Sequence, residues 1–171
     1  MLVSAPSVLV DHSLLKEDLA RELEDTRREF LALLDQVPER VWGRIKVNKR
    51  WSAKECMWHI LCYLSFVVPR GRSNALRGGK LRLPPGRLGR FLNFLIPRIA
   101  ARKETKENLR WKYQEFHRLI MEMLQEIEDW EWSLETVIPK GRVSLEGLFR
   151  YHREHFQHHA VQIRRALATW P

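Results

Sequence analysis

The sequence predicts an all-α protein with four main helices in one domain, residues 1–171. Three observations support this fold class. Long amphipathic stretches recur at helical spacing, no two segments form a convincing pair of strands, and 171 residues suffice for one sizeable core but not comfortably for two. Seven Trp and seven Phe exclude a disordered chain.

The first helix is expected over about residues 13–36, where leucines and Phe30 recur at helical spacing between charged residues. The next helix opens at Ser52, because Ser52 and Glu55 form a capping-box pattern and Trp51 precedes them as a hydrophobic staple. Its sequence, "WSAKECMWHILCYLSFVVP", is apolar nearly all round, which predicts a buried central helix. Pro69 marks its end or a kink.

Residues 70–90, which contain five Gly and two Pro, are predicted to form a basic loop between the second and third main helices. The segment "FLNFLIPRIA" that follows could be a short helix packed on the core or a lid. The third and fourth main helices are expected over about 101–129 and 145–169, the latter capped by Ser144. "WEWSLETVIPKGR" connects them.

The net charge of +9 belongs to one segment. Ten Lys or Arg and no Asp or Glu lie between Arg70 and Lys103, whereas the rest of the chain holds 20 basic and 21 acidic residues. We consider three interpretations: a solvated loop, a contact with a membrane surface or nucleic acid, or a gate that attracts an anionic substrate or thiol cofactor. No specific nucleic-acid motif is present. The candidate gate residues are Arg77, Lys80, Arg82, Arg87 and Arg90.

Other features suggest a cytoplasmic protein without a transmembrane segment. Cys56 and Cys62 lie about 120° apart on one helix, so they are not expected to bridge each other. The N-terminus lacks the basic region of a signal peptide, and no apolar run approaches the roughly 20 residues of a membrane span. The aromatic clusters "WEWSL" and "FLNFLIP" could form a homodimer surface or cover the domain's own core.

Four of the seven histidines lie in the eight residues 152–159. A helical wheel at 100° per residue places His152, His155 and His159 on or beside the core face and His158 on its margin. Three buried imidazoles each need a polar partner, and a shared cation is the simplest common explanation. His155 and His159, at i,i+4 spacing, could hold one ion from adjacent turns.

A third ligand must come from another helix, and His59 in the apolar second helix is the candidate. Three histidines would leave coordination positions open, which is typical of a catalytic metal site. The alternative is that these are core histidines bonded to carbonyl groups. His152 is interpreted as a core or supporting residue. Cys56 and Cys62, three positions either side of His59, are interpreted as small core residues, although a thiolate ligand or nucleophile is conceivable.

Three segments, "LLDQVPERVW", "WSAKECMWHIL" and "VSLEGLFRYHREHFQHHAVQIRR", resemble the DinB/YfiT-like superfamily in order and spacing. Its W-S-x-x-E-x-x-x-H and H-x-x-x-H motifs, the second followed by Gln-Ile, fall on Trp51, Ser52, Glu55, His59, His155, His159, Gln162 and Ile163. The resemblance implies a down-up-up-down four-helix bundle with a divalent metal, typically zinc or nickel, held by the three histidines. Members with assigned activity resemble metal-dependent hydrolases, or transferases that use low-molecular-weight thiols such as bacillithiol or mycothiol.

The main hypothesis is therefore a metal-dependent enzyme, either a hydrolase or a thiol-dependent S-transferase, acting on a small-molecule substrate. His59, His155 and His159 would hold the metal, which activates water or a thiol. The alternative is a non-catalytic module whose basic loop contacts an acidic partner or anionic surface, with a purely structural metal. A sensor of metal or thiol state is a third hypothesis.

Overall fold

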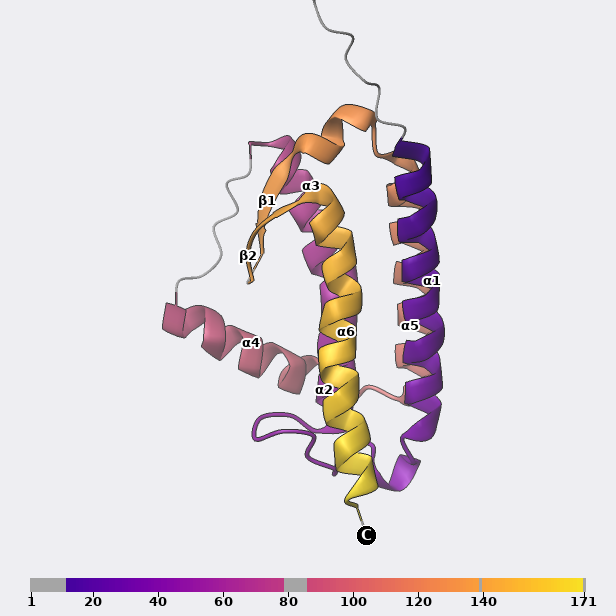
Figure 1. Ribbon diagram of the computed structural model, residues 1–171. Coiled ribbons are helices and arrows are strands. Elements are labelled where there is room, and N and C mark those ends of the chain that lie inside the picture. The colour runs from indigo at the N-terminus through magenta and orange to yellow at the C-terminus, as the bar shows by residue number, and fades with distance from the viewer. Residues whose placement is uncertain (1–11, 79–85, 139, 171) are drawn as a thin grey trace, which may run out of the picture.

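The computed structural model describes residues 12–78, 86–138 and 140–170. Its main body is a bundle of four long helical rods: α1 (His12–Gln36), α2 (Ala53–Cys62) continued by α3 (Val68–Leu76), α5 (Lys106–Glu126) and α6 (Leu145–Ala168). In Figure 1, α1 and α6 run down, whereas α2–α3 and α5 run up. The predicted all-α class and down-up-up-down bundle are confirmed. Among the described residues, no helix is long and apolar enough to cross a membrane.

The bundle core forms from the apolar stripes that the sequence predicts. Leu19, Leu23 and Phe30 of α1 are buried, and the Phe30 ring stacks on Tyr113 of α5 at a centroid distance of 3.8 Å. Phe156 of α6 packs at the same place, with its centroid 6.3 Å from that of Phe30. These contacts hold α1 against α5 and α6 and set the height of α6 along the bundle.

Both predicted caps are present. The Ser52 hydroxyl accepts a hydrogen bond from the Glu55 backbone N–H, and the Glu55 carboxylate accepts one from the Ser52 N–H at 2.6 Å. At the start of α6, the Ser144 hydroxyl accepts from the Gly147 N–H at 3.1 Å. Because a capping box satisfies two free backbone donors, it fixes the residue at which α2 begins and hence which residues α2 turns inward.

The predicted loop over residues 70–90 is wrong in part, because α3 continues the second helix to Leu76 and α4 (Gly86–Ala100) begins a further helix. A π-helical turn (Tyr63–Val67) precedes α3. Pro69 therefore lies in the first turn of α3, where the missing backbone N–H of proline costs little. Gly71 is needed for close packing: a Cβ there would lie 2.7 Å from Leu148 Cδ2 of α6. Thus Pro69 and Gly71 belong to a helix.

A short antiparallel hairpin corrects the expectation that the chain has no strand pair. β1 (Glu135–Ile138) pairs with β2 (Gly141–Ser144), with Thr136 opposite Val143. Gly141 has φ of +135°, a backbone conformation that favours glycine. Each strand has four residues, too few for alternation to stand out in the sequence, and both contact α6. Two 3-10 turns, Glu39–Val41 and Asp129–Ser133, complete the connections.

Helix α4 lies outside the bundle and crosses beside α2 (Figure 1). Pro97 is buried against the bundle, and Trp51 donates its indole N–H to the Phe94 carbonyl oxygen at 3.4 Å. The Arg98 guanidinium lies 3.6 Å from the Glu55 carboxylate. The segment is therefore a helix that is held by these contacts, while Phe91, Ile96 and Ile99 stay exposed.

Candidate metal centre

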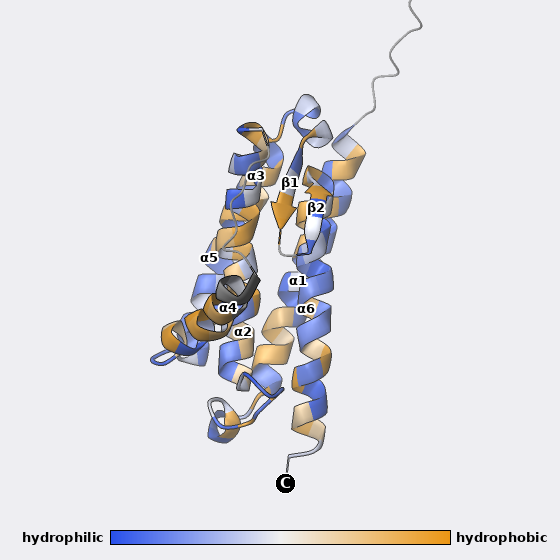
Figure 2. Ribbon diagram, turned by 90° about the vertical axis from the view of Figure 1, so that its left-hand side faces the viewer, coloured by the Kyte–Doolittle hydropathy of each residue, from blue (hydrophilic) through white to orange (hydrophobic). Residues whose placement is uncertain are grey.

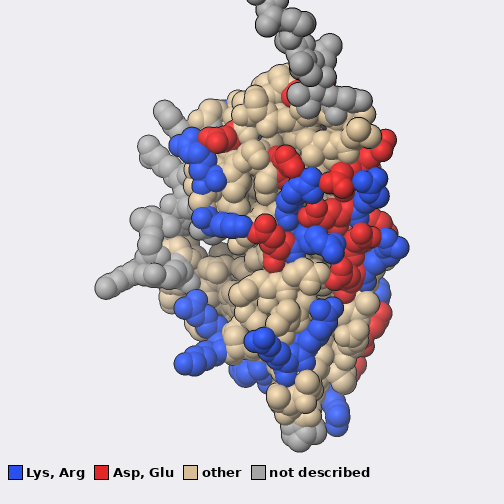
Figure 3. All heavy atoms as spheres, in the orientation of Figure 1, with Lys and Arg blue, Asp and Glu red and all other residues tan. Residues whose placement is uncertain are grey.

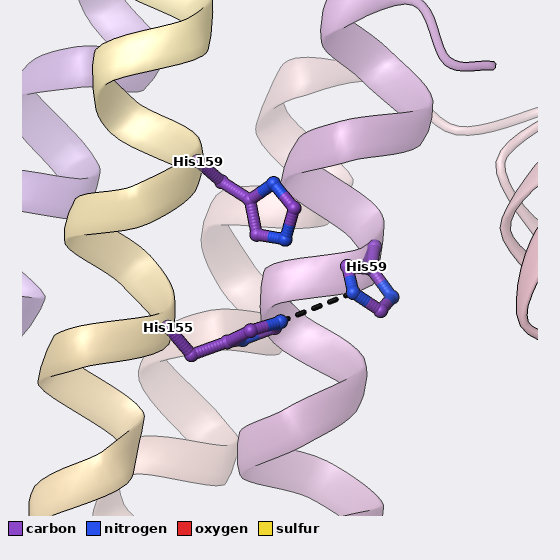
Figure 4. Close-up of side chains that lie close together, drawn as sticks. All are labelled: His59, His155 and His159. Atoms are coloured by element: carbon purple, nitrogen blue, oxygen red, sulfur yellow. Dashed lines mark hydrogen bonds between the residues drawn. The ribbon is translucent and has the colours of Figure 1, made fainter. Parts of the chain in front are cut away.

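Two adjacent helices bring three histidines together. His59 projects from α2, and His155 and His159 project from successive turns of α6; all three point toward one another in Figure 4. Each offers a ring nitrogen, and these nitrogens all lie within 4.8 Å of one another. The His155 and His59 Nε2 atoms are 3.1 Å apart. The structure thus unites residues that are 96 positions apart in the chain.

The cluster is formed by neutral imidazoles. Burial, together with the neighbouring imidazoles, lowers the pKa of His59 to about 3, of His155 to about 2 and of His159 to about 4. A neutral imidazole keeps a nitrogen lone pair free to bind a metal. Near pH 7 the chain therefore holds three uncharged nitrogen donors around one point.

The spacing of one nitrogen pair fits a divalent metal, whereas separations near the 4.8 Å limit of the group exceed the roughly 4.2 Å that two metal–nitrogen bonds span, so a ring would rotate on binding. At a metal–nitrogen distance of about 2.0–2.1 Å, two nitrogens in a tetrahedral site lie about 3.3 Å apart. The 3.1 Å separation between His155 Nε2 and His59 Nε2 is close to this value. The three rings meet edge to face, with centroids 4.8 to 5.1 Å apart, and do not stack. Their side chains point toward one another (Figure 4). Among the described residues this is the group with metal-ligand spacing.

Aromatic side chains form the walls of the cluster. The Trp51 ring lies with its centroid 4.5 Å from that of His59 and 5.9 Å from that of His159. The ring centroid of Tyr63 lies 5.2 Å from that of His155, and the Tyr63 hydroxyl donates to the Leu148 carbonyl oxygen at 3.0 Å. These rings restrict the orientation of the imidazoles and exclude water from their sides.

A polar chain supports His159. Its Nδ1 lies 3.4 Å from the Gln162 side-chain oxygen, which also accepts from the Asn48 amide at 2.9 Å. The Asn48 oxygen in turn accepts from the Trp51 backbone N–H at 2.9 Å. An oxygen acceptor at Nδ1 places the proton there and leaves Nε2 as the free donor to a metal. The sequence indicated Gln162 only as part of the family motif and did not indicate Asn48, although Gln162 follows His159 by three residues and so shares its face.

The other histidines lie outside the cluster. His152 is fully buried, with Nε2 2.9 Å from the Tyr113 hydroxyl, which agrees with its interpretation as a core residue. His158 is exposed and contacts the Gln162 amide at 2.9 Å. His117 lies on α5 with Nε2 3.6 Å from the Glu24 carboxylate.

Neither cysteine is suited to act as a thiolate. Cys56 is fully buried, and burial raises the pKa of its thiol to about 12. Cys62 is half-buried, and burial raises its pKa too. Both thiols are therefore protonated near neutral pH, which favours their interpretation as core residues.

The candidate gate residues are spread over the segment after α3. Arg77 is exposed at the end of α3. Lys80 and Arg82 lie outside the described residues, and Arg87 and Arg90 lie in α4 with side chains that are likewise outside the description. The gate for an anionic substrate stays a prediction.

Comparisons with solved structures agree with this architecture. YfiT from Bacillus subtilis, described as a probable metal-dependent hydrolase with an unusual four-helix bundle topology, superposes with a TM-score of 0.70 at 13% identity, covering 97% of this chain and 90% of that one. An uncharacterised protein from Clostridium difficile 630 gives 0.67 at 15% identity, covering 88% and 94%. At such identities the likeness shows the fold.

A mycothiol-dependent maleylpyruvate isomerase gives a TM-score of 0.68 at 15% identity, covering 89% of this chain. This chain spans only 62% of that protein's length. No curated protein matches the sequence. The family model of the DinB superfamily, however, matches residues 22–163, which include the whole histidine cluster and most of the bundle, and the chain therefore belongs to the DinB superfamily.

Proposed function

We propose that this protein is a metal-dependent enzyme that acts on a small molecule, as a hydrolase or as a low-molecular-weight-thiol-dependent S-transferase. The observation that carries the proposal is the convergence of three neutral imidazoles, His59, His155 and His159, within 4.8 Å. Zinc or nickel is the expected ion, since imidazole nitrogen is a good ligand for both.

The residues of the cluster have separate tasks in this proposal. His59, His155 and His159 would hold the metal through one nitrogen each, and Gln162 would keep the His159 ring in the required tautomer. Three protein ligands leave coordination positions for other molecules, as in catalytic sites and unlike closed structural sites. When bound, a divalent metal supplies Lewis acidity that lowers the pKa of a ligated water or thiol toward neutral.

The two versions differ in the nucleophile. In the hydrolase version it comes from water, and in the transferase version from a small thiol supplied by the cell. Both protein thiols are buried or half-buried and protonated, so neither version assigns a nucleophile to Cys56 or Cys62. The descriptions of the structural neighbours, one a probable metal-dependent hydrolase and one a mycothiol-dependent isomerase, support testing both versions.

The first test is elemental analysis of tag-free protein. We expect near-stoichiometric zinc or nickel in the native chain and loss of metal from His59→Ala and from the double variant His155→Ala/His159→Ala. His158→Ala is the matched control, because this exposed histidine lies beside the cluster on the same helix, and it should retain metal. A native chain that stays metal-free after incubation with zinc and nickel would refute the proposal.

The second test separates the two versions. Metal-loaded protein is assayed against ester, amide and electrophilic substrates with and without bacillithiol, mycothiol or glutathione. Turnover without thiol assigns the hydrolase version, and turnover that requires thiol assigns the transferase version. Activity that survives in a metal-free His59→Ala variant would show that the cluster does not carry the reaction.

A further inference from the structure

Helix α4 turns its apolar side away from the protein. Phe91, Ile96 and Ile99 are 54%, 46% and 57% exposed, and Leu92 and Leu95 are half-buried. At 100° per residue, these five side chains fall within an arc of about 140°. Figure 2 shows α4 outside the bundle with hydrophobic residues over much of its length.

The opposite side of α4 faces the bundle. Pro97, which is buried, lies about 170° from the centre of the apolar arc. The Phe94 carbonyl oxygen, which accepts from the Trp51 indole, belongs to this side, whereas Arg98 pairs with Glu55 from the margin of the arc, about 20° from Phe91. The helix is thus attached along its inner side, and three of the five side chains of its apolar arc, Phe91, Ile96 and Ile99, stay exposed. An exposed apolar helix face of this size is typical of an interaction site.

The charge around α4 indicates the kind of partner. The segment Arg70–Lys103 contains ten basic and no acidic residues. Arg102 and Lys103, in the turn that follows α4, are exposed. In Figure 3 the coloured side chains near α4 are basic, whereas acidic and basic side chains mix over α1 and α6. An amphipathic helix that combines apolar residues with arginines is typical of binding to an anionic bilayer surface.

A second copy of the chain is a poorer fit. A twofold interface places the same patch on both partners, so two α4 helices would bring together two copies of the segment Arg70–Lys103, which contains no acidic residue. An anionic lipid surface instead accepts the apolar arc between its acyl chains and pairs the arginines with phosphate groups.

We propose that α4 is a docking helix for anionic bilayers, with Phe91, Ile96 and Ile99 entering the interface and Arg102 and Lys103 contacting lipid phosphates. The Trp51 indole, which contacts His59 and bonds to the α4 backbone, connects this surface to the histidine cluster. Docking would therefore bring the site close to the membrane surface. The proposal depends on α4 alone and not on the chemistry of the cluster.

The test is co-sedimentation of the full chain with vesicles of phosphatidylcholine alone and of an equal mixture with phosphatidylglycerol. We expect binding to the anionic vesicles only, weakening as salt rises. Phe91→Ser/Ile96→Ser/Ile99→Ser should lower the partition coefficient at least about tenfold. Arg102→Gln/Lys103→Gln should lower it about fivefold per charge.

The matched control replaces three exposed apolar residues elsewhere, Leu14→Ser/Trp111→Ser/Leu119→Ser, and should bind like the native chain. Circular dichroism of each variant confirms that the bundle is intact. The proposal is overturned if the native chain ignores anionic vesicles or if the α4 variant binds them as well as the control does. Two other results would also overturn the proposal. One is a native chain that does not bind vesicles but forms a dimer that the α4 variant loses. The other is binding to duplex DNA that the apolar substitutions do not change.

Discussion

Mild acid should destabilise the metal-free protein strongly. Burial lowers the pKa of His59, His152, His155 and His159 to between about 2 and 4, whereas in the unfolded chain each returns to its usual value of 6.5. Below about pH 6.5 the unfolded state therefore binds more protons than the folded state, and the free energy of unfolding falls as the pH falls. Most carboxylates titrate below this window.

The size of the effect follows from the pKa shifts. At about pH 5 a histidine that stays neutral when folded costs about 2 kcal/mol, since each pKa unit is worth about 1.4 kcal/mol. Four such residues set an upper bound of about 8 kcal/mol, comparable with the entire stability of an ordinary domain.

Urea unfolding of metal-stripped protein between about pH 7.5 and about pH 5 measures this loss. In His152→Gln, which removes one of the four imidazoles, the loss should shrink by about 2 kcal/mol. If the free energy of unfolding changes by less than about 1 kcal/mol over this range, the histidines are not held neutral by burial and the reasoning is wrong.

Three further predictions concern single side chains. Gln162→Ala should weaken zinc binding about 10- to 100-fold in a chelator competition while leaving the helical circular dichroism unchanged. An unchanged zinc affinity would show that Gln162 does not orient His159. Tyr113→Phe leaves the buried His152 Nε2 without its partner and should cost about 1–3 kcal/mol in urea unfolding; a neutral result would mean that water replaces the hydroxyl. Arg72→Ala leaves the buried Glu131 carboxylate unpaired and should cost about 3–5 kcal/mol by the same measurement, whereas a loss under about 1 kcal/mol would show that this bidentate pair does not anchor α3.

The segment around α3 shows why its glycines and prolines led to a wrong prediction of a loop. Glycine and proline usually mark loops, and residues 70–90 contain seven of them. Gly71, however, meets a need that arises only when α3 packs on α6, because Leu148 occupies the space of a Cβ. Arg72 likewise has its partner, Glu131, 59 residues away. Neither contact can be deduced from neighbouring residues in the sequence.

The sequence by itself determined two of the long helices, α1 and α6, and their inward faces. Helical periodicity and caps depend on residues within a few positions of each other, so α1 and α6 were predicted within a residue or two, and the inward placement of His152 and His159 followed from the wheel.

The sequence predicted that His59, His155 and His159 meet but left core histidines as the alternative, and only the tertiary structure shows which of the inward histidines lie together. His152 and His155 are three residues apart on one helix, yet His152 pairs with Tyr113 of α5 whereas His155 faces His59 of α2. The outward direction of Phe91, Ile96 and Ile99 of α4 was decided in the same way, by the contacts that hold α4 to the bundle. Periodicity shows that a helix has an apolar face, but packing between distant segments selects what that face contacts.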